Sequence, residues 1–216
     1  VIDLSERVGR IAAALPETET VVVVPYLGGW AVGRLDAPET ASRVVALEAW
    51  LDGPDATSRP IAQPPNRFPF DHPLYIVYSS GTTGLPKCIV HGAGGTLLQH
   101  LKEHLLHTDL RRSDRLFYFT TCGWMMWNWL VSGLASGATL LLYDGSPFVG
   151  RGNILFDYAE AEGMTHFGTS AKFIDAIAKI NLAPAKTHKL DRLRAIFSTG
   201  SPLVPEAFGY VYDNIK

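Results

Sequence analysis

Residues 115–144, "RLFYFTTCGWMMWNWLVSGLASGATLLLYD", carry the pattern that decides the fold of this chain of 216 residues. The run 115–121 is short and apolar, as in a buried strand, and the segment 125–135 has apolar residues at helical spacing. The run 138–144 is again short and apolar. A strand, a helix and a strand in this order predict a β-α-β unit with two parallel strands.

The same alternation continues on both sides of this unit. It predicts further strands over 74–80, 88–92, 165–170 and 193–200, and further helices over 95–108, 152–162, 171–180 and from Pro205. Repeated strands and helices with apolar strands are typical of an α/β protein. We therefore expect a layered α/β fold with a largely parallel sheet flanked by helices.

The first third of the chain is less regular. An amphipathic pattern predicts a helix over 2–15, a continuous apolar run predicts a strand over 21–28, and residues 39–51 read as a helix. Residues 52–73 are rich in proline and are expected to form a loop. The predicted organisation is a partial N-terminal α/β region over 1–73, followed by an α/β core segment over 74–216.

Composition excludes several classes of protein. The net charge is −2 and 19% of the residues are charged, so a nucleic-acid surface is not expected. The most apolar stretch, 127–143, contains Asn128 and is shorter than the roughly 20 residues that a membrane span needs. Two cysteines, Cys88 and Cys122, cannot build a disulfide framework, which favours a reducing compartment such as the cytoplasm.

The segment "SSGTTGLPK" (79–87) is a candidate phosphate-binding loop. Its glycines let the backbone approach an anion closely, its hydroxyls add donors, and Lys87 adds a positive charge. The glycine spacing differs from that of the Walker A loop, and an extended run follows instead of a helix. By residue type alone, a hairpin turn rich in Ser, Thr and Gly is an equally good interpretation. The loop donors are Ser79, Ser80, Gly81, Thr82, Thr83 and Gly84.

The string "YSSGTTGLPK" resembles the phosphate loop of the adenylate-forming enzymes, which include acyl-CoA synthetases, luciferases and peptide-synthetase adenylation domains. Residues 88–110, 120–148 and 197–212 resemble the acetoacetyl-CoA synthetase family in particular. The resemblance implies a ligase of lipid metabolism whose substrates are ATP with Mg²⁺, acetoacetate and coenzyme A. The acid would first form an acyl-adenylate, and coenzyme A would then displace AMP.

The resemblance also implies roles for individual residues. Residues 79–84 would wrap the β- and γ-phosphates, with Lys87 as the catalytic lysine beside them. Gly123 and Trp124 would close the acyl pocket. No residue is assigned to a metal site. The adenine would lie against Gly200, Ser201 and Pro202.

Two matters stay open at this stage. The alternative substrate is a different short-chain acid, and the alternative class is a nucleotide-binding protein without catalysis. The family's later acidic, ribose-binding and lysine motifs are not found before Lys216, so we expect a fragment of the large N-terminal domain that is inactive alone. Apolar surface exposed in such a fragment would favour a homo-oligomer.

A rival signal is "HLKEH" (100–104), which has the H-x-x-E-H order of some zinc peptidases. Without an identifiable further ligand, we expect no zinc, with the histidines on an exposed face opposite a buried leucine stripe. That stripe consists of Leu97, Leu98, Leu101 and Leu105. Of the aromatic cluster 124–129, all but Trp124 and Asn128 are expected in the core.

Overall fold

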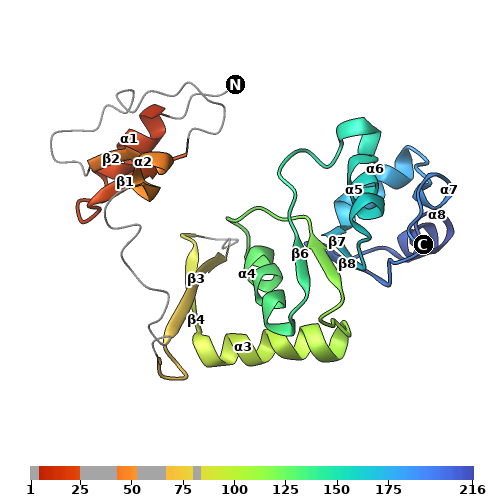
Figure 1. Ribbon diagram of the computed structural model, residues 1–216, viewed down its shortest axis with the longest axis horizontal. Helices are drawn as coiled ribbons and strands as arrows, with labels where there is room; N and C mark the ends of the chain where they lie inside the picture. Colours follow the sequence, from red (N-terminus) through yellow and green to blue (C-terminus); the bar gives the residue numbers. More distant parts are fainter. Residues whose placement is uncertain (1–4, 25–42, 53–66, 80–83) are drawn as a thin grey trace. The chain divides into compact units, whose positions relative to one another are not determined.

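Alternating strands and helices reappear in the computed structural model of the protein, which describes residues 5–24, 43–52, 67–79 and 84–216 (Figure 1). The chain divides into two units, Val1–Asn66 and Arg67–Lys216. The predicted phosphate loop falls partly outside the described residues, because Ser80, Gly81, Thr82 and Thr83 are not among them.

The first unit contains a small parallel sheet. Its elements are α1 (Ser5–Ala13), β1 (Thr20–Val23), β2 (Arg43–Ala46) and α2 (Leu47–Leu51). The helix predicted over 39–51 is wrong at 43–46, because these residues pair with β1 in parallel. Val44 and Val45 are β-branched and therefore suit a strand better than a helix. The helix that follows is confined to α2.

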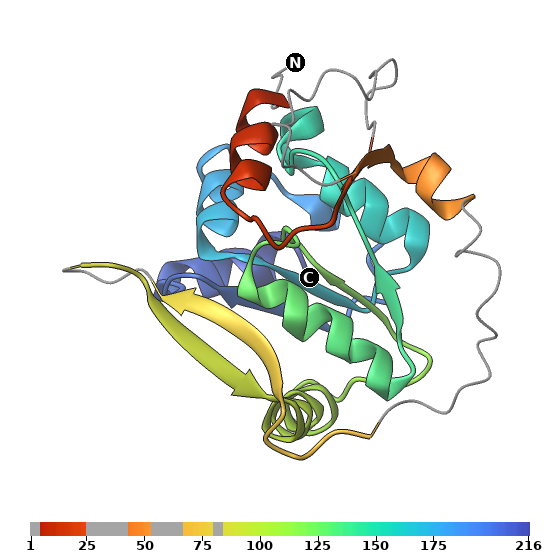
Figure 2. The ribbon, with the colours of Figure 1, turned by 90° about the vertical axis from the view of Figure 1, so that its left-hand side faces the viewer.

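The second unit begins with an antiparallel hairpin of β3 (Pro73–Ser79) and β4 (Lys87–Gly92), which correspond to the strands predicted over 74–80 and 88–92. The hairpin is tied to the start of α3 (Ala93–Lys102), because the N–H groups of Ala93 and Gly94 donate to the carbonyls of His72 and Phe70, both at 2.8 Å. Figure 2 shows α3 nearly end-on beside this hairpin. Ser79, the last residue of β3, lies opposite Lys87, the first residue of β4.

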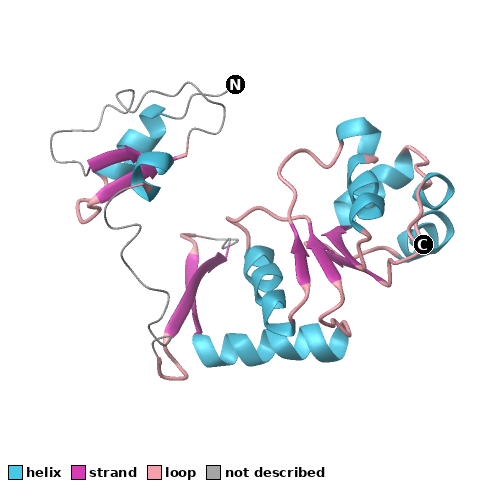
Figure 3. Ribbon diagram, in the orientation of Figure 1, coloured by secondary structure: helices cyan, strands magenta, loops and turns pink. Residues whose placement is uncertain are grey.

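A second sheet of four parallel strands confirms the predicted fold class (Figure 3). It consists of β5 (Arg115–Tyr118), β6 (Thr139–Leu141), β7 (His166–Ser170) and β8 (Ala195–Thr199), in the order β6-β5-β7-β8. All three pairings are parallel. The connections from β5 and from β7 lead in opposite directions, so a topological switch point lies between these two strands.

Strand alternation divides the core of this unit into two clusters. Leu116 and Tyr118 of β5 pack with α4 (Met125–Ser132) on one face of the sheet. Phe117 packs on the other face, with α5 (Ile154–Glu162), α6 (Ala171–Lys179) and α8 (Pro205–Asn214). Figure 1 shows these helices on the two sides of the sheet. A short helix, α7 (Pro184–Thr187), was not predicted.

Helix α3 departs from the expected burial pattern. At Glu103 it continues as a π-helical turn, Glu103–His107. The prediction of a buried leucine stripe opposite exposed histidines is wrong, because Leu97, Leu98 and Leu105 are exposed whereas His104 is completely buried. A π turn shifts the residues that follow relative to the helix face, and His104 is held by a hydrogen bond to the carbonyl of Trp129 at 3.0 Å.

The aromatic cluster after β5 largely follows the prediction. Met126 and Trp129 are buried, and Trp127 is half-buried. Met125 is 52% exposed and is not a core residue.

None of the helices in the described part of the chain is long and apolar enough to cross a membrane.

Two histidines of this unit are completely buried. His104 and His166 are fully buried, and burial lowers the pKa of each below its ordinary value of 6.5. The Nε2–H of His104 donates to the Trp129 carbonyl. Its Nδ1 has no partner among the described residues, so a proton added there would be a buried charge without an acceptor.

We expect the free energy of unfolding to have its full value above the ordinary histidine pKa. It should decrease as the pH falls below that pKa. The reason is that the unfolded chain then binds protons that the folded chain does not. Urea unfolding between about pH 7.5 and 5.5, where most carboxylates stay ionised, would measure this. His104→Gln can still donate to Trp129 and should flatten the decline. An unchanged slope in that variant would exclude His104 as its source.

Candidate functional site

The candidate site lies at the carboxyl ends of β5, β7 and β8. In open parallel sheets, ligands bind at this edge, where the connections diverge to opposite sides. β5 ends at Tyr118 and is followed by a loop that reaches α4, and β8 ends at Thr199, just before Gly200. The sheet therefore brings the loops over 119–124 and 200–204 to the same edge.

Trp124 and Gly200 are neighbours at this edge. A Cβ atom built on Gly200 would be 3.5 Å from Cη2 of Trp124 and 3.8 Å from Cζ2. Gly200 has a φ of +89°, which L side chains rarely adopt, so glycine suits this turn for its backbone as well. Trp124 directly precedes α4 and is 43% exposed. The structure thus joins a residue predicted for the acyl pocket to one predicted for the adenine site.

Beneath this pair, the hydroxyl of Tyr118 connects two strands. It donates to the Thr169 carbonyl at 3.0 Å and shares a hydrogen bond of 2.7 Å with Oγ1 of Thr199. Burial raises the pKa of Tyr118 above its ordinary value, and the bond to Thr199 opposes this shift. The phenol is therefore neutral at physiological pH and keeps its proton for donation.

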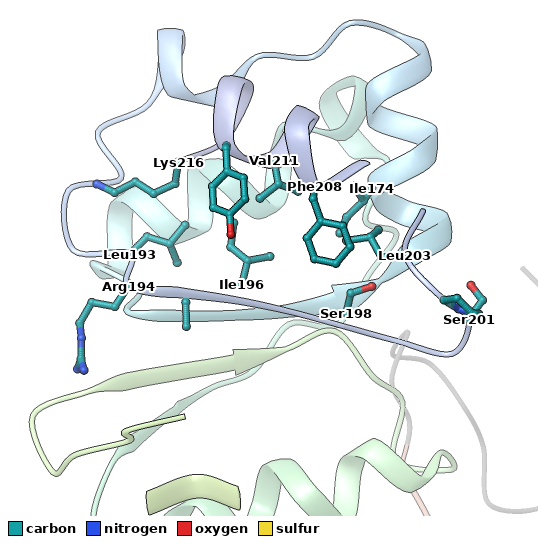
Figure 4. Close-up of a pocket in the computed structure, with 13 residues that line it drawn as sticks. Ile174, Leu193, Arg194, Ile196, Ser198, Ser201, Leu203, Phe208, Val211 and Lys216 are labelled. Atoms are coloured by element: carbon teal, nitrogen blue, oxygen red, sulfur yellow. The ribbon is translucent and has the colours of Figure 1, made fainter. Parts of the chain in front are cut away.

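Ser201 and Pro202, the other two predicted adenine residues, line a cavity of about 550 Å³. The cavity runs along the outer edge of β8 beneath α8, and its walls are mostly apolar (Figure 4). Figure 4 shows Ser201 at one end, with Arg194 and Lys216 at the other. Oγ of Ser198, also in the lining, is buried and has no partner among the described residues.

A second cavity, of about 500 Å³, lies where β5 and β6 end. Residue patterns did not single out most of its lining. The lining lies at and just after the carboxyl ends of two predicted strands, and this position is the signal that could have found it. Gly123 lies next to this lining in the chain, and a Cβ built on it would meet nothing within 4 Å. The lining includes Thr120, Thr121, Cys122, Trp127, Tyr143 and Asp144.

The described part of the phosphate loop is open to solvent. Gly84 and Lys87 are exposed, and a Cβ built on Gly84 would meet nothing within 4 Å. Lys87 forms no ion pair with any residue that the structure describes, so its ammonium group is available to an anion. No hydrogen bond or ion pair among the described residues links this hairpin to the Trp124–Gly200 pair.

The histidine-rich turn of α3 is engaged in packing. Glu103 accepts hydrogen bonds from the indole N–H of Trp129 at 2.8 Å and from the side-chain amide of Gln99 at 2.6 Å. His104 lies beneath Trp129, with ring centroids 4.2 Å apart. His91 is exposed on β4. Over the described residues, no group of three or more His, Cys, Asp or Glu side chains is arranged to hold a metal ion.

Comparison with known proteins places the chain in a family. The sequence profile described as "AMP-binding enzyme" matches residues 3–213. The chain belongs to the AMP-binding enzyme family. The predicted resemblance to adenylate-forming enzymes is therefore confirmed at the level of the family.

Individual relatives of this AMP-binding enzyme chain are similar over almost all of it. Acetoacetyl-coenzyme A synthetase of Rhizobium meliloti is 56% identical over 214 residues, covering 99% of this chain and 31% of the relative. Malonamoyl-CoA synthetase of Penicillium aethiopicum is 43% identical, covering 94% of the chain and 30% of the relative. The solved acetoacetyl-CoA synthetase from Streptomyces lividans superposes with a TM-score of 0.82 at 40% identity, covering 98% of this chain and 30% of that one. The chain thus spans about a third of the length of these proteins.

Proposed function

We propose that this chain is part of an ATP-dependent acid–thiol ligase that activates acetoacetate as acyl-adenylate and transfers it to coenzyme A. The observation that carries the proposal is that the Trp124 ring lies next to Gly200 at the carboxyl edge of the parallel sheet, where a Cβ on residue 200 would touch it. It juxtaposes an aromatic wall with a turn whose backbone a flat nucleotide base can approach closely. Membership of the AMP-binding enzyme family supports the same reaction class.

The reaction depends on positioning of the substrates more than on a strong base. A carboxylate is already ionised at neutral pH, and its oxygen would attack the α-phosphorus of ATP and release pyrophosphate. The coenzyme A sulfur would then attack the acyl carbon and release AMP. Charge neutralisation around the phosphates is the main catalytic requirement. In this proposal Lys87, Ser79, Gly84 and residues 80–83 serve the phosphates, and Mg²⁺ arrives bound to ATP as part of the substrate.

The remaining assignments concern the adenine and the acyl group, and of these residues Ser201 and Pro202 line the cavity beneath α8. Gly200, Ser201 and Pro202 would face the adenine, and Gly123 and Trp124 would close the acyl pocket. The choice of acetoacetate rests on the relatives, and one of them acts on a different short-chain acid according to its name. We also propose a reducing compartment such as the cytoplasm, because Cys88 and Cys122 are both free and exposed.

The proposal is tested in a completed ligase, meaning a full-length protein that contains residues 1–216, for example a chimaera with the Rhizobium meliloti relative. We expect acetoacetate-dependent exchange of pyrophosphate into ATP. In the same assay, Trp124→Gly should shift relative kcat/KM toward a six-carbon acid by about tenfold or more, because a few methylenes in a pocket are worth that much.

Trp124→Phe is the matched control, since it keeps an aromatic wall and should shift the preference less than Trp124→Gly does. Equal acid preferences in all three proteins would remove Trp124 from the acyl pocket. Binding of ATP without exchange for any acid would favour a nucleotide-binding protein without catalysis.

A further inference from the structure

A buried polar network supports both sides of the Trp124–Gly200 contact. On one side, Tyr118 binds the hydroxyl of Thr199, the residue directly before Gly200. On the other side, Trp129 lies in the helix that begins directly after Trp124. The rings of Tyr118 and Trp129 meet edge-on, with centroids 5.9 Å apart. The two sides are therefore connected through a pair of packed aromatic rings.

Trp129 is held in place by hydrogen bonds as well as by packing. Its indole N–H donates to Glu103, and its carbonyl accepts from His104 and from the hydroxyl of Ser132 at 2.7 Å. The rings of Trp129 and Phe197 also meet edge-on, with centroids 5.9 Å apart. Helix α4 is thus locked to the π-helical turn of α3 and to β8, which limits how Trp124 can move.

Tyr118 is the point where this network reaches the sheet edge. Its side chain is 3% exposed, and the carbonyl that it binds belongs to Thr169, which is 1% exposed. Gly168 leaves the space in which the tyrosine ring lies across β7, because a Cβ there would overlap the ring. The hydroxyl is thereby held at the end of β7 and within reach of Thr199.

We propose that Tyr118 is a positioning residue that holds the Thr199–Gly200 turn against Trp124. Its hydroxyl is occupied by two protein partners, so this group acts through Thr199, while Tyr118 also lines the second cavity. The effect on substrate binding rests on the proposed function, in which Gly200 faces the adenine. Loss of the hydroxyl would leave β8 in place but allow the turn after it to take other positions.

The first test follows Tyr118→Phe in the completed ligase, with Tyr210→Phe as the matched control. The Tyr210 hydroxyl donates to the Leu182 carbonyl at 2.6 Å, so the control removes one protein hydrogen bond, whereas Tyr118→Phe removes the bonds to Thr169 and Thr199. We expect Tyr118→Phe to raise the KM for ATP by about threefold to tenfold, in line with the net value of one hydrogen bond. The KM for coenzyme A should change little, and Tyr210→Phe should leave both constants unchanged. Equal effects of the two variants on the KM for ATP would overturn the proposal.

A second test needs no activity. Amide hydrogen exchange in the 216-residue chain should become faster at residues 199–201 and 203 in Tyr118→Phe and not in Tyr210→Phe. Thr199→Val should produce the same change, and the double variant should add nothing, because both substitutions remove one shared bond. Unchanged exchange at these amides, or additive effects, would contradict the proposal even if the completed ligase proved inactive. Absence of acetoacetate-dependent pyrophosphate exchange in the unmodified ligase would instead count against the proposed function.

Discussion

Gly168→Ala is expected to lower the free energy of unfolding of the second unit by about 3 kcal/mol, the upper range for overpacking a core. Gly168 lies in the interior strand β7, and an alanine Cβ would be 2.6 Å from Cγ of Tyr118, with other ring atoms closer still. The ring cannot move aside, because Tyr118 is buried and its hydroxyl is bound at two places. The strand would have to shift instead.

Urea unfolding would measure this loss, and Gly209→Ala is the matched control. Gly209 lies within α8, and a Cβ built there would meet nothing within 4 Å. Alanine should therefore stabilise α8 by about 0.5–1 kcal/mol, because glycine is costly inside a helix. Combining Gly168→Ala with Tyr118→Leu should recover part of the loss by making room. A stable Gly168→Ala protein would show that the ring does not lie across β7.

The sequence predicted the elements whose patterns are local. The strands β5 to β8 and the helices between them were found because each is short, apolar and separated from the next by glycine or polar residues. The segment 43–46 was misread because its strand depends on pairing with β1, about twenty residues earlier in the chain. Burial of His104 was also missed, since it is decided by Trp129 on another helix. Contacts between distant segments produce no periodic pattern of residues in the sequence.

The sequence likewise identifies some residues of the candidate site and not others. Gly123, Trp124 and Gly200 belong to strings that resemble a family motif, so they could be named before the structure was known. Tyr118 and Thr199 could not, because each looks like an ordinary strand residue. Their importance comes from the strand order, which places β5 next to β7 and β7 next to β8. The hydroxyl of Tyr118 can then span from the first of these strands to the third.

Lys87→Ala is expected to slow acid-dependent pyrophosphate exchange of the completed ligase by about 100-fold, the typical loss when one group that stabilises developing charge is removed. Lys87 begins β4 directly opposite Ser79, at the base of the glycine-rich loop. Strand pairing fixes its backbone while its side chain stays exposed and forms no ion pair with a described residue. A cation held in this way can meet a phosphate without first breaking an ion pair with any residue that the structure describes.

The same exposure predicts that the substitution spares the fold, so the thermal unfolding midpoint of Lys87→Ala should match that of the unmodified chain. Lys102→Ala is the matched control, because Lys102 is also an exposed lysine, in the last turn of α3. It should leave the exchange rate unchanged. Lys87→Arg keeps the charge but not the compact ammonium group, and it should recover only part of the rate. If Lys87→Ala and Lys102→Ala exchange pyrophosphate equally fast, Lys87 has no role at the phosphates, and the hairpin is only a turn rich in hydroxyl groups.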